Sequence, residues 1–194
     1  MSTDKIFIKN TAPSICGIKP ANLFSISSSC QNQKKINLWK YELSAIGLSL
    51  FEIPSGENFT LLFLCDINWI KKIISLPQNK KFFKSFGYTV VDNPYSMLFQ
   101  IFSRVSGSYG SKNFPHEIGL FLGYPLNDVI NFINHHGKNC KLCGYWKSYS
   151  NVEQAQQKFI QYKNCSRLCC KLFDQGYSVQ QIINEYKKAV SNAA

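Results

Sequence analysis

The stretch "LSLFEIPSGENFTLLFLC", residues 48–65, decides the fold class. Two apolar runs flank "PSGEN", residues 54–58, in which proline, glycine, serine and asparagine are typical of a turn. Both runs are rich in residues that favour strands, so the stretch predicts a β-hairpin in which residues 48–53 pair with residues 58–65. The second run contains "LLFLC", the longest purely apolar segment of the chain. It is far shorter than the ~20 residues that a membrane helix needs, so no membrane span is expected.

Apolar residues at helical spacing predict helices on both sides of this hairpin. The breakers Pro13, Gly17 and Pro20 predict turns or short helices over residues 10–29. The segment "KLCGYWKSY", residues 141–149, is typical of one later strand. The predicted helices cover residues 31–46, 67–76, 79–86, 94–105 and 152–174, with a last helix after Ser178 and a helical pair near residues 116–136.

The sequence therefore predicts one α+β domain over residues 1–194. Its small antiparallel sheet would consist of the hairpin plus the one later strand, packed with about seven helices. Residues 1–10 are expected to form a loose N-terminus.

The composition is that of a globular protein. Of the 194 residues, 45% are hydrophobic and only 17% are charged, which provides a core and argues against disorder. The start, "MSTDKIFIKN", lacks the apolar stretch of a signal peptide. A soluble, cytoplasmic protein is expected, and its eight cysteines are expected to be free thiols.

The net charge of +11 raises the question of nucleic-acid binding. All of the 22 basic residues except Arg104 and Arg167 are lysines, whereas nucleic-acid surfaces usually use arginine. A local group of lysines could attract a polyanion or an acidic protein, but a solvated helical face is the favoured interpretation. This group comprises Lys71, Lys72, Lys80, Lys81 and Lys84.

The stretch "HEIGLFLGYP", residues 116–125, permits two interpretations. A His–Glu pair suggests acid–base or metal chemistry, but adjacent residues on a helix diverge by about 100° and cannot converge on one ion. The second interpretation is a helical hairpin that turns at Gly123 with positive φ, with Pro125 starting the next helix. Because no Lys or Arg occurs in that next helix before Lys138, we expect packing rather than DNA reading. His116 is expected at the edge of this junction, near the segment 141–149.

Cysteines offer an alternative metal site. Cys140 and Cys143 form a C-x2-C pair, and Cys165 and Cys169 are one helical turn apart, so the four could hold zinc or an iron–sulfur cluster. However, Cys165 and Cys169 fall on the apolar stripe of their helix, where buried cysteine is common. The favoured prediction is no metal and no cofactor.

Four blocks of the chain resemble a bacterial family of proteins containing a domain of unknown function. The blocks are "TAPSICGIKPANLFSI", "FPHEIGLFLGYPLNDVINFI", "CGYWKSY" and "AQQKFIQYKNC", which together reach from residue 11 to residue 165. The resemblance implies no activity and no catalytic residues. Relatives have His-Cys just before Ala12, where this chain has Asn10 and Thr11, so a thiol or metal role at that place is not expected here.

The favoured function is that of a binding or accessory protein with a pocket for an anionic small molecule or an acidic partner, because aromatic rings beside lysines suit a planar anion. No nucleophile, base and orienting group can be matched by spacing, so an enzyme is less favoured. A His- or thiol-dependent enzyme, a cysteine–metal protein and nucleic-acid binding through the lysine group remain as alternatives. The predicted pocket residues are Lys19, His116, Glu117, Tyr124, Tyr145, Trp146 and Lys147.

Overall fold

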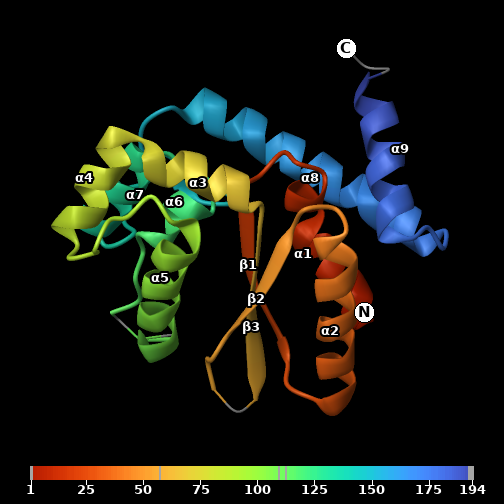
Figure 1. Cartoon of the computed structure of the whole chain (residues 1–194). Helices are drawn as coiled ribbons and strands as arrows, with labels where there is room; N and C mark the ends of the chain where they lie inside the picture. The colour runs from red at the N-terminus through yellow and green to blue at the C-terminus, as the bar shows by residue number, and fades with distance from the viewer. Residues whose placement is uncertain (1, 57, 109, 112, 192–194) are drawn as a thin grey trace.

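The computed structural model describes residues 2–56, 58–108, 110–111 and 113–191. Glu57 of the predicted turn, and Tyr109 and Lys112 of the loop after α5, lie outside these residues. In chain order the elements are α1 (Thr3–Ile15), β1 (Ala21–Ser27), α2 (Cys30–Ser44), β2 (Ser49–Ile53), β3 (Phe59–Cys65), α3 (Ile67–Ser75), α4 (Pro77–Ser85), α5 (Pro94–Ser108), α6 (Ile118–Phe121), α7 (Leu126–Asn134), β4 (Leu142–Cys143), β5 (Lys147–Ser148), α8 (Val152–Asp174) and α9 (Val179–Ser191) (Figure 1).

The predicted hairpin is confirmed as β2 and β3, and β3 is the central strand of an antiparallel sheet with the order β1-β3-β2. In β1, Ala21 pairs with Cys65, and in β2, Ser49 pairs with the same residue from the other side. Because successive side chains of a strand point to opposite faces, β3 divides its apolar side chains between the two faces of the sheet. Leu61 and Phe63 belong to one hydrophobic cluster, and Leu62 belongs to the other.

Helices cover both faces of this sheet. Residues of α1, α2, α8 and α9 form the cluster on one face, and residues of α3 to α7 form the cluster on the other. In Figure 1 the sheet stands between α2 on one side and α5 on the other, and the long α8 runs across the top. The chain is therefore one α+β domain, as predicted, with a three-stranded sheet between two helical layers.

The third strand of the sheet differs from the prediction. It is β1, which precedes the hairpin, while the segment 141–149 forms its own two-stranded hairpin, β4–β5. In this hairpin Gly144 donates a backbone hydrogen bond to the carbonyl of Trp146, so residues 144–146 form a turn rather than a strand. Because the chain reverses there, Tyr145 and Trp146 lie in the turn and only Lys147 belongs to a strand.

The N-terminus also differs from the prediction. Residues 3–15 form α1, which continues through Pro13. The part of the predicted loose N-terminus from residue 3 to residue 10 is therefore helical. Phe7 and Ile8 are almost fully buried, and the Phe7 ring stacks on Trp39 of α2 at 4.2 Å between centroids. Burial of these side chains outweighs the one backbone hydrogen bond that a proline removes.

Most predicted helices after the hairpin are confirmed, and their caps explain their starts. Asn151 accepts a hydrogen bond from the backbone of Gln154 at the start of α8, and Asn93 accepts two at the start of α5. Asp66 caps α3 in the same way. The described residues contain nine helices, and the one that was not foreseen is α1, while the predicted helical pair is confirmed as the very short α6 and α7.

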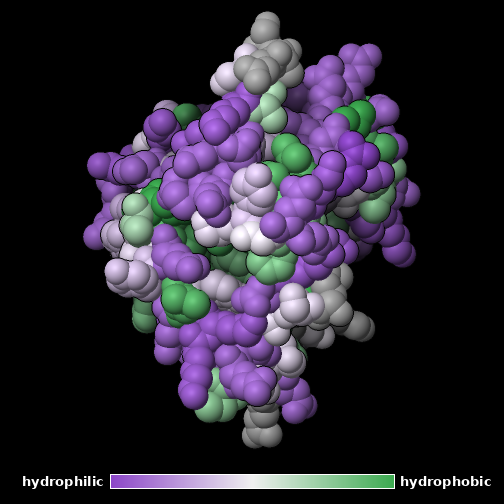
Figure 2. Space-filling model, turned by 90° about the vertical axis from the view of Figure 1, so that its right-hand side faces the viewer, coloured by the Kyte–Doolittle hydropathy of each residue, from purple (hydrophilic) through white to green (hydrophobic). Residues whose placement is uncertain are grey.

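The surface on the side of α2 and α9 is largely hydrophilic, with hydrophobic residues scattered over it (Figure 2). None of the helices in the described part of the chain combines the length and the hydrophobicity needed to cross a membrane.

Candidate functional site

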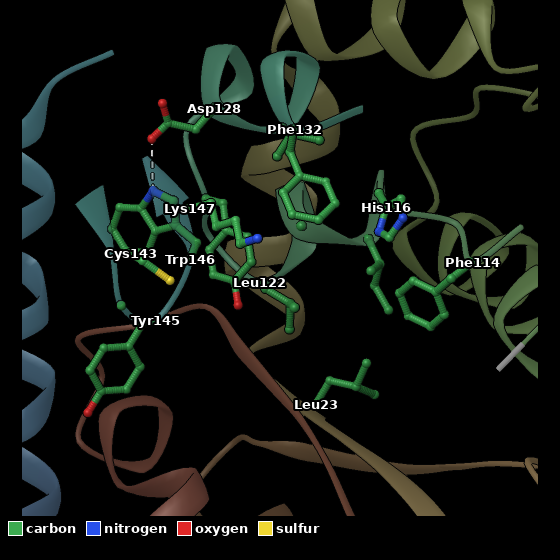
Figure 3. A pocket seen from close by; sticks show the side chains of 15 residues that line it. Leu23, Phe114, His116, Leu122, Asp128, Phe132, Cys143, Tyr145, Trp146 and Lys147 are labelled. Carbon is green, nitrogen blue, oxygen red and sulfur yellow. Dashed lines mark hydrogen bonds between the residues drawn. The ribbon is translucent and has the colours of Figure 1, made fainter. Parts of the chain in front are cut away.

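A cavity of about 300 Å³ lies where β1, the α6–α7 junction and the β4–β5 hairpin meet. Figure 3 shows its labelled side chains coming from these elements, with Leu23 below, Trp146 on the hairpin side, and His116 and Phe114 opposite, while the Tyr145 ring extends away from the centre. Aromatic and aliphatic side chains make up most of the wall. The lining residues are Leu23, Phe114, His116, Ile118, Gly119, Leu122, Tyr124, Asp128, Val129, Phe132, Cys143, Gly144, Tyr145, Trp146 and Lys147.

The α6–α7 junction positions one side of the cavity through two glycines. Gly123 has φ +82°, and a Cβ added there would lie 2.6 Å from Cδ of Pro20. A Cβ on Gly119 would lie 3.0 Å from both Tyr124 and Val129. The predicted turn at Gly123 is confirmed, and close packing at both positions explains why the junction is built with glycine.

Asp128 of α7 holds the β4–β5 hairpin against the cavity. Its Oδ2 accepts a hydrogen bond from Trp146 Nε1 at 2.8 Å, and its Oδ1 accepts bonds from Tyr149 N, Ser150 N and Ser150 Oγ at 2.8–3.0 Å. Burial alone would raise the pKa of Asp128, but these hydrogen bonds outweigh it and hold the pKa below its usual value. The carboxylate is thus ionised, and its acceptor positions are used by hydrogen bonds within the protein.

Aromatic rings form a continuous wall. Trp146 stacks on Tyr124 at 5.4 Å between centroids and meets Phe159 of α8 edge to face at 4.6 Å. On the opposite side, the His116 ring lies 5.5 Å from Phe114 and 4.7 Å from Phe132. Burial lowers the pKa of His116, so its imidazole is neutral at pH 7.

Lys147 is the cation of the cavity. Its Nζ donates one hydrogen bond, at 2.7 Å, to the carbonyl of Gly137 and lies 5.9 Å from the centre of the Phe132 ring. Within the described ranges, no carboxylate forms an ion pair with it. Since an ammonium group has three N–H donors, two remain for another acceptor.

Two predicted pocket residues, Glu117 and Lys19, do not line the cavity. Glu117 points to the other side of α6, where it accepts hydrogen bonds from Tyr88 Oη at 2.8 Å and from Arg104 at 3.4 Å. As expected for adjacent helical residues, His116 and Glu117 do not share a partner. Glu117 is therefore placed to join α6 to α5 and to the segment before α5, and not to act on a ligand in the cavity.

Lys19 is buried beside the aromatic wall. Its Nζ donates to Asn22 Oδ1 at 2.7 Å and lies 5.7 Å and 6.0 Å from the ring centres of Tyr124 and Tyr162. Burial lowers its pKa to about 8. Lys19 thus supports the wall of the cavity from outside, with no carboxylate paired to it in the part of the chain that the structure describes.

The cysteines do not form the four-membered set that their spacing allowed. Cys165 and Cys169 are buried, as the apolar stripe predicted, and the thiol that joins them is that of Cys16, at the end of α1. Cys140 and Cys143 are not part of this group, and Cys143 lines the cavity instead. The contribution of Cys16 was missed because it is 153 residues from Cys169 and depends on the unforeseen helix α1.

Hydrogen bonds within this group change the acidity of its members. Those from Cys16 and Cys165 lower the pKa of the Cys169 thiol, while hydrogen bonds with the other two thiols, together with burial, raise that of Cys16.

The lysine group of α3 and α4 lies on exposed surface, as expected of a solvated face. Lys71, Lys72, Lys81 and Lys84 are exposed, and Lys80 forms an ion pair with Asp92 at 2.7 Å. The junction α6–α7 does not place a basic helix beside them, because α7 contains no lysine or arginine.

Comparison with models of protein families gives a match over most of the chain. A family model described as "Protein of unknown function (DUF3793)" matches residues 7–183, which include all four blocks of the resemblance. No curated protein and no solved structure matches the chain.

Proposed function

Because the chain belongs to the DUF3793 family of proteins of unknown function, we propose a function from the chemistry of the cavity itself. The chain is a binding protein for a compact small molecule with an aromatic body and one anionic group. The observation that carries this proposal is an ammonium group, that of Lys147, with free donors in a cavity whose lining is mostly aromatic and aliphatic and whose carboxylate, Asp128, is already hydrogen-bonded to the protein.

The size and lining of the cavity favour an aromatic body. Its volume of about 300 Å³ is at the lower end of small-molecule pockets, which are mostly apolar with a few placed polar groups. The rings of Trp146, Tyr124 and Phe132 offer faces and edges to a flat ligand.

The charge balance favours an anion. Asp128, the carboxylate in the lining, already accepts four hydrogen bonds from the protein, so it has little capacity left for a cationic ligand. His116 is neutral at pH 7 and can act as a hydrogen-bond donor or acceptor. The local charge that remains for a ligand is positive and comes from Lys147.

Calorimetric titration with 1-naphthoate and its neutral analogue 1-naphthalenemethanol tests this proposal. We expect the carboxylate to bind about tenfold more tightly than the alcohol, because a charge-assisted hydrogen bond is worth roughly 1.5–3 kcal/mol. Lys147→Met should remove this preference for the carboxylate. His116→Ala should weaken the binding of both compounds and leave the stability of the protein nearly unchanged.

Lys141→Met is the matched control, because Lys141 is an exposed lysine of the same hairpin region that does not line the cavity. It should retain the preference for the carboxylate. If neither compound binds, or if Lys147→Met and Lys141→Met behave alike, the proposal is wrong.

A further inference from the structure

Three thiols from distant parts of the chain meet on the face of the sheet that α1, α2, α8 and α9 cover. The Sγ atoms of Cys16, Cys165 and Cys169 all lie within 4.8 Å of one another, and those of Cys16 and Cys169 are 3.5 Å apart. Cys165 and Cys169 are 1% exposed, and Cys16 is 7% exposed. The arrangement forms because Cys165 and Cys169 are one turn apart on α8 and α1 ends directly opposite them.

This arrangement differs from that of an ordinary core cysteine. Cys65 of β3 is fully buried among apolar side chains and, among the residues that the structure describes, belongs to no such group. Buried cysteines that serve only as small hydrophobes need not bring their sulfur atoms together. Convergence of three sulfur atoms on one point is instead what a thiophilic ion requires.

We propose that Cys16, Cys165 and Cys169 form a three-coordinate, sulfur-only site for a soft metal or metalloid ion, of the class of Cu(I) and trivalent arsenic. This site is separate from the aromatic cavity and independent of the ligand proposed there.

The number of ligands selects against zinc. Structural zinc takes four ligands in tetrahedral geometry. Among the described residues, no histidine, aspartate or glutamate completes the group of three cysteines. Soft ions that accept two or three thiolates have no such requirement, and soft sulfur ligands favour Cu(I).

A groove reaches one member of the thiol group, Cys16. Cys16 lines an open groove of about 420 Å³ between the end of α1, the segment 45–48 and α9. Lys187 and Asp66 both line this groove, so the positive charge that can offset the bound thiolates is balanced by a carboxylate. On the inner side, Tyr186 of α9 is buried in the same hydrophobic cluster as Cys165, where its hydroxyl can act as a positioning residue for that sulfur.

The binding step is balanced for both ions. Arsenous acid, As(OH)₃, reacts with three thiols to give a neutral trithiolate and three water molecules, without a change of oxidation state. Cu(I) displaces the thiol protons to the solvent and leaves a negatively charged complex. The neutral arsenic complex suits an apolar interior better, since buried charge is costly.

The test uses the full-length chain, reduced and kept free of oxygen, in which the remaining partly or fully exposed cysteines are serine (Cys30, Cys140, Cys143 and Cys170). Native mass spectrometry with arsenite, and Cu(I) titration against a competing chelator, give the number of bound ions and the affinity. We expect one ion per chain. Cys169→Ala and Cys16→Ala should each weaken binding by more than the ~10–100-fold typical of losing an outer partner, and Tyr186→Phe should fall within that range.

Cys65→Ala in the same background is the matched control, because it removes a buried thiol outside the group and should leave binding unchanged. Circular dichroism of each variant separates loss of binding from loss of fold. Binding of arsenite alone or of Cu(I) alone supports the site and identifies the ion. The site is refuted by Zn²⁺ binding more tightly than both, by no ion binding at all, or by binding that folded Cys16→Ala and Cys169→Ala both retain.

Discussion

Gly123 illustrates how a single residue supports the cavity wall. Its positive φ and its contact with Pro20 impose two separate requirements, since a side chain would strain the backbone and also collide with the proline ring. Gly176 also has positive φ, +87°, but a Cβ there would meet nothing within 4 Å. The two positions therefore allow the cost of the collision to be separated from the cost of the backbone conformation.

We expect Gly123→Val to lower the free energy of unfolding by roughly 2–4 kcal/mol, which combines the left-handed backbone cost with overpacking. Gly176→Val should lower the free energy of unfolding by only about 1–2 kcal/mol. Urea denaturation at pH 7 measures both, and equal losses would contradict the role assigned to Pro20.

Lys19 makes the stability depend on pH in the alkaline range. Its pKa is about 8 in the folded chain and near 10.5 when exposed, so between these values the unfolded chain holds a proton that the folded chain has lost. The free energy of unfolding therefore rises with pH in this window through Lys19. Relative to Lys19→Met, the wild type should gain about 2 kcal/mol between pH 7.5 and 9.5.

Paired urea titrations of the two proteins at both pH values provide the measurement. Cysteine and tyrosine ionisation affects both proteins and cancels in the difference. A difference that does not change with pH would mean that the Lys19 ammonium is solvated in the folded chain.

At the scale of elements, the β4–β5 hairpin depends on α7 through Asp128. Asp128→Asn replaces one acceptor oxygen by an NH₂ group, which then faces donors such as Trp146 Nε1 or Tyr149 N. We expect a loss of about 2 kcal/mol in the free energy of unfolding, because a donor is left unpaired in a buried place.

The control for this change is Asp174→Asn, which removes an exposed carboxylate paired with Lys5 and should cost under about 1 kcal/mol. Thermal unfolding followed by circular dichroism compares the two. An Asp128→Asn protein as stable as the wild type would show that the hairpin holds its place without the carboxylate.

The elements that could be predicted from the sequence are those whose signals are local. Asn93 and Asn151 precede apolar runs at helical spacing, and the turn residues between β2 and β3 lie within a short stretch. The pairing of β1 with β3 has no such signal, because Ala21 and Cys65 are far apart in the sequence. Helix α1 was hidden by Pro13, whose local effect is overridden by tertiary burial.

The same distinction holds for the candidate site. His116, Tyr124, Trp146 and Lys147 were predicted because aromatic and basic residues cluster within two short segments. Leu23 of β1 was not, because its place in the wall follows from the strand pairing. Likewise, Glu117 was assigned to the site only because it follows His116 in the sequence. In the structure its side chain points away from the cavity, toward Tyr88.

At the scale of the whole molecule, the sheet joins the two hydrophobic clusters into one unit. Strand β3 contributes side chains to both clusters. If β3 leaves one cluster, it also leaves the other, and the apolar side chains of both become exposed. We therefore expect unfolding in urea to be a single transition, with coincident curves from tryptophan fluorescence and far-UV circular dichroism. Limited proteolysis within residues 106–113 that released two stable halves would contradict this.

Metal removal is a second prediction at this scale. The core around Cys16 and Cys169 consists of packed apolar side chains, so no structural zinc or iron is needed for the fold. Dialysis against a chelator should leave the midpoint of thermal unfolding unchanged. A midpoint that falls as one equivalent of zinc or iron is lost would refute this.

Both faces of β3 are buried, and this restricts where residues can be inserted or deleted. Deleting one residue from 59–65 would exchange the two sets of side chains, so that residues shaped for the helices of one layer would face those of the other. A deletion of two residues would restore the alternation but displace the pairing with both β1 and β2. Insertions and deletions in homologous chains should therefore fall in the turn 54–58, where neither the alternation nor the pairing of the strands is disturbed.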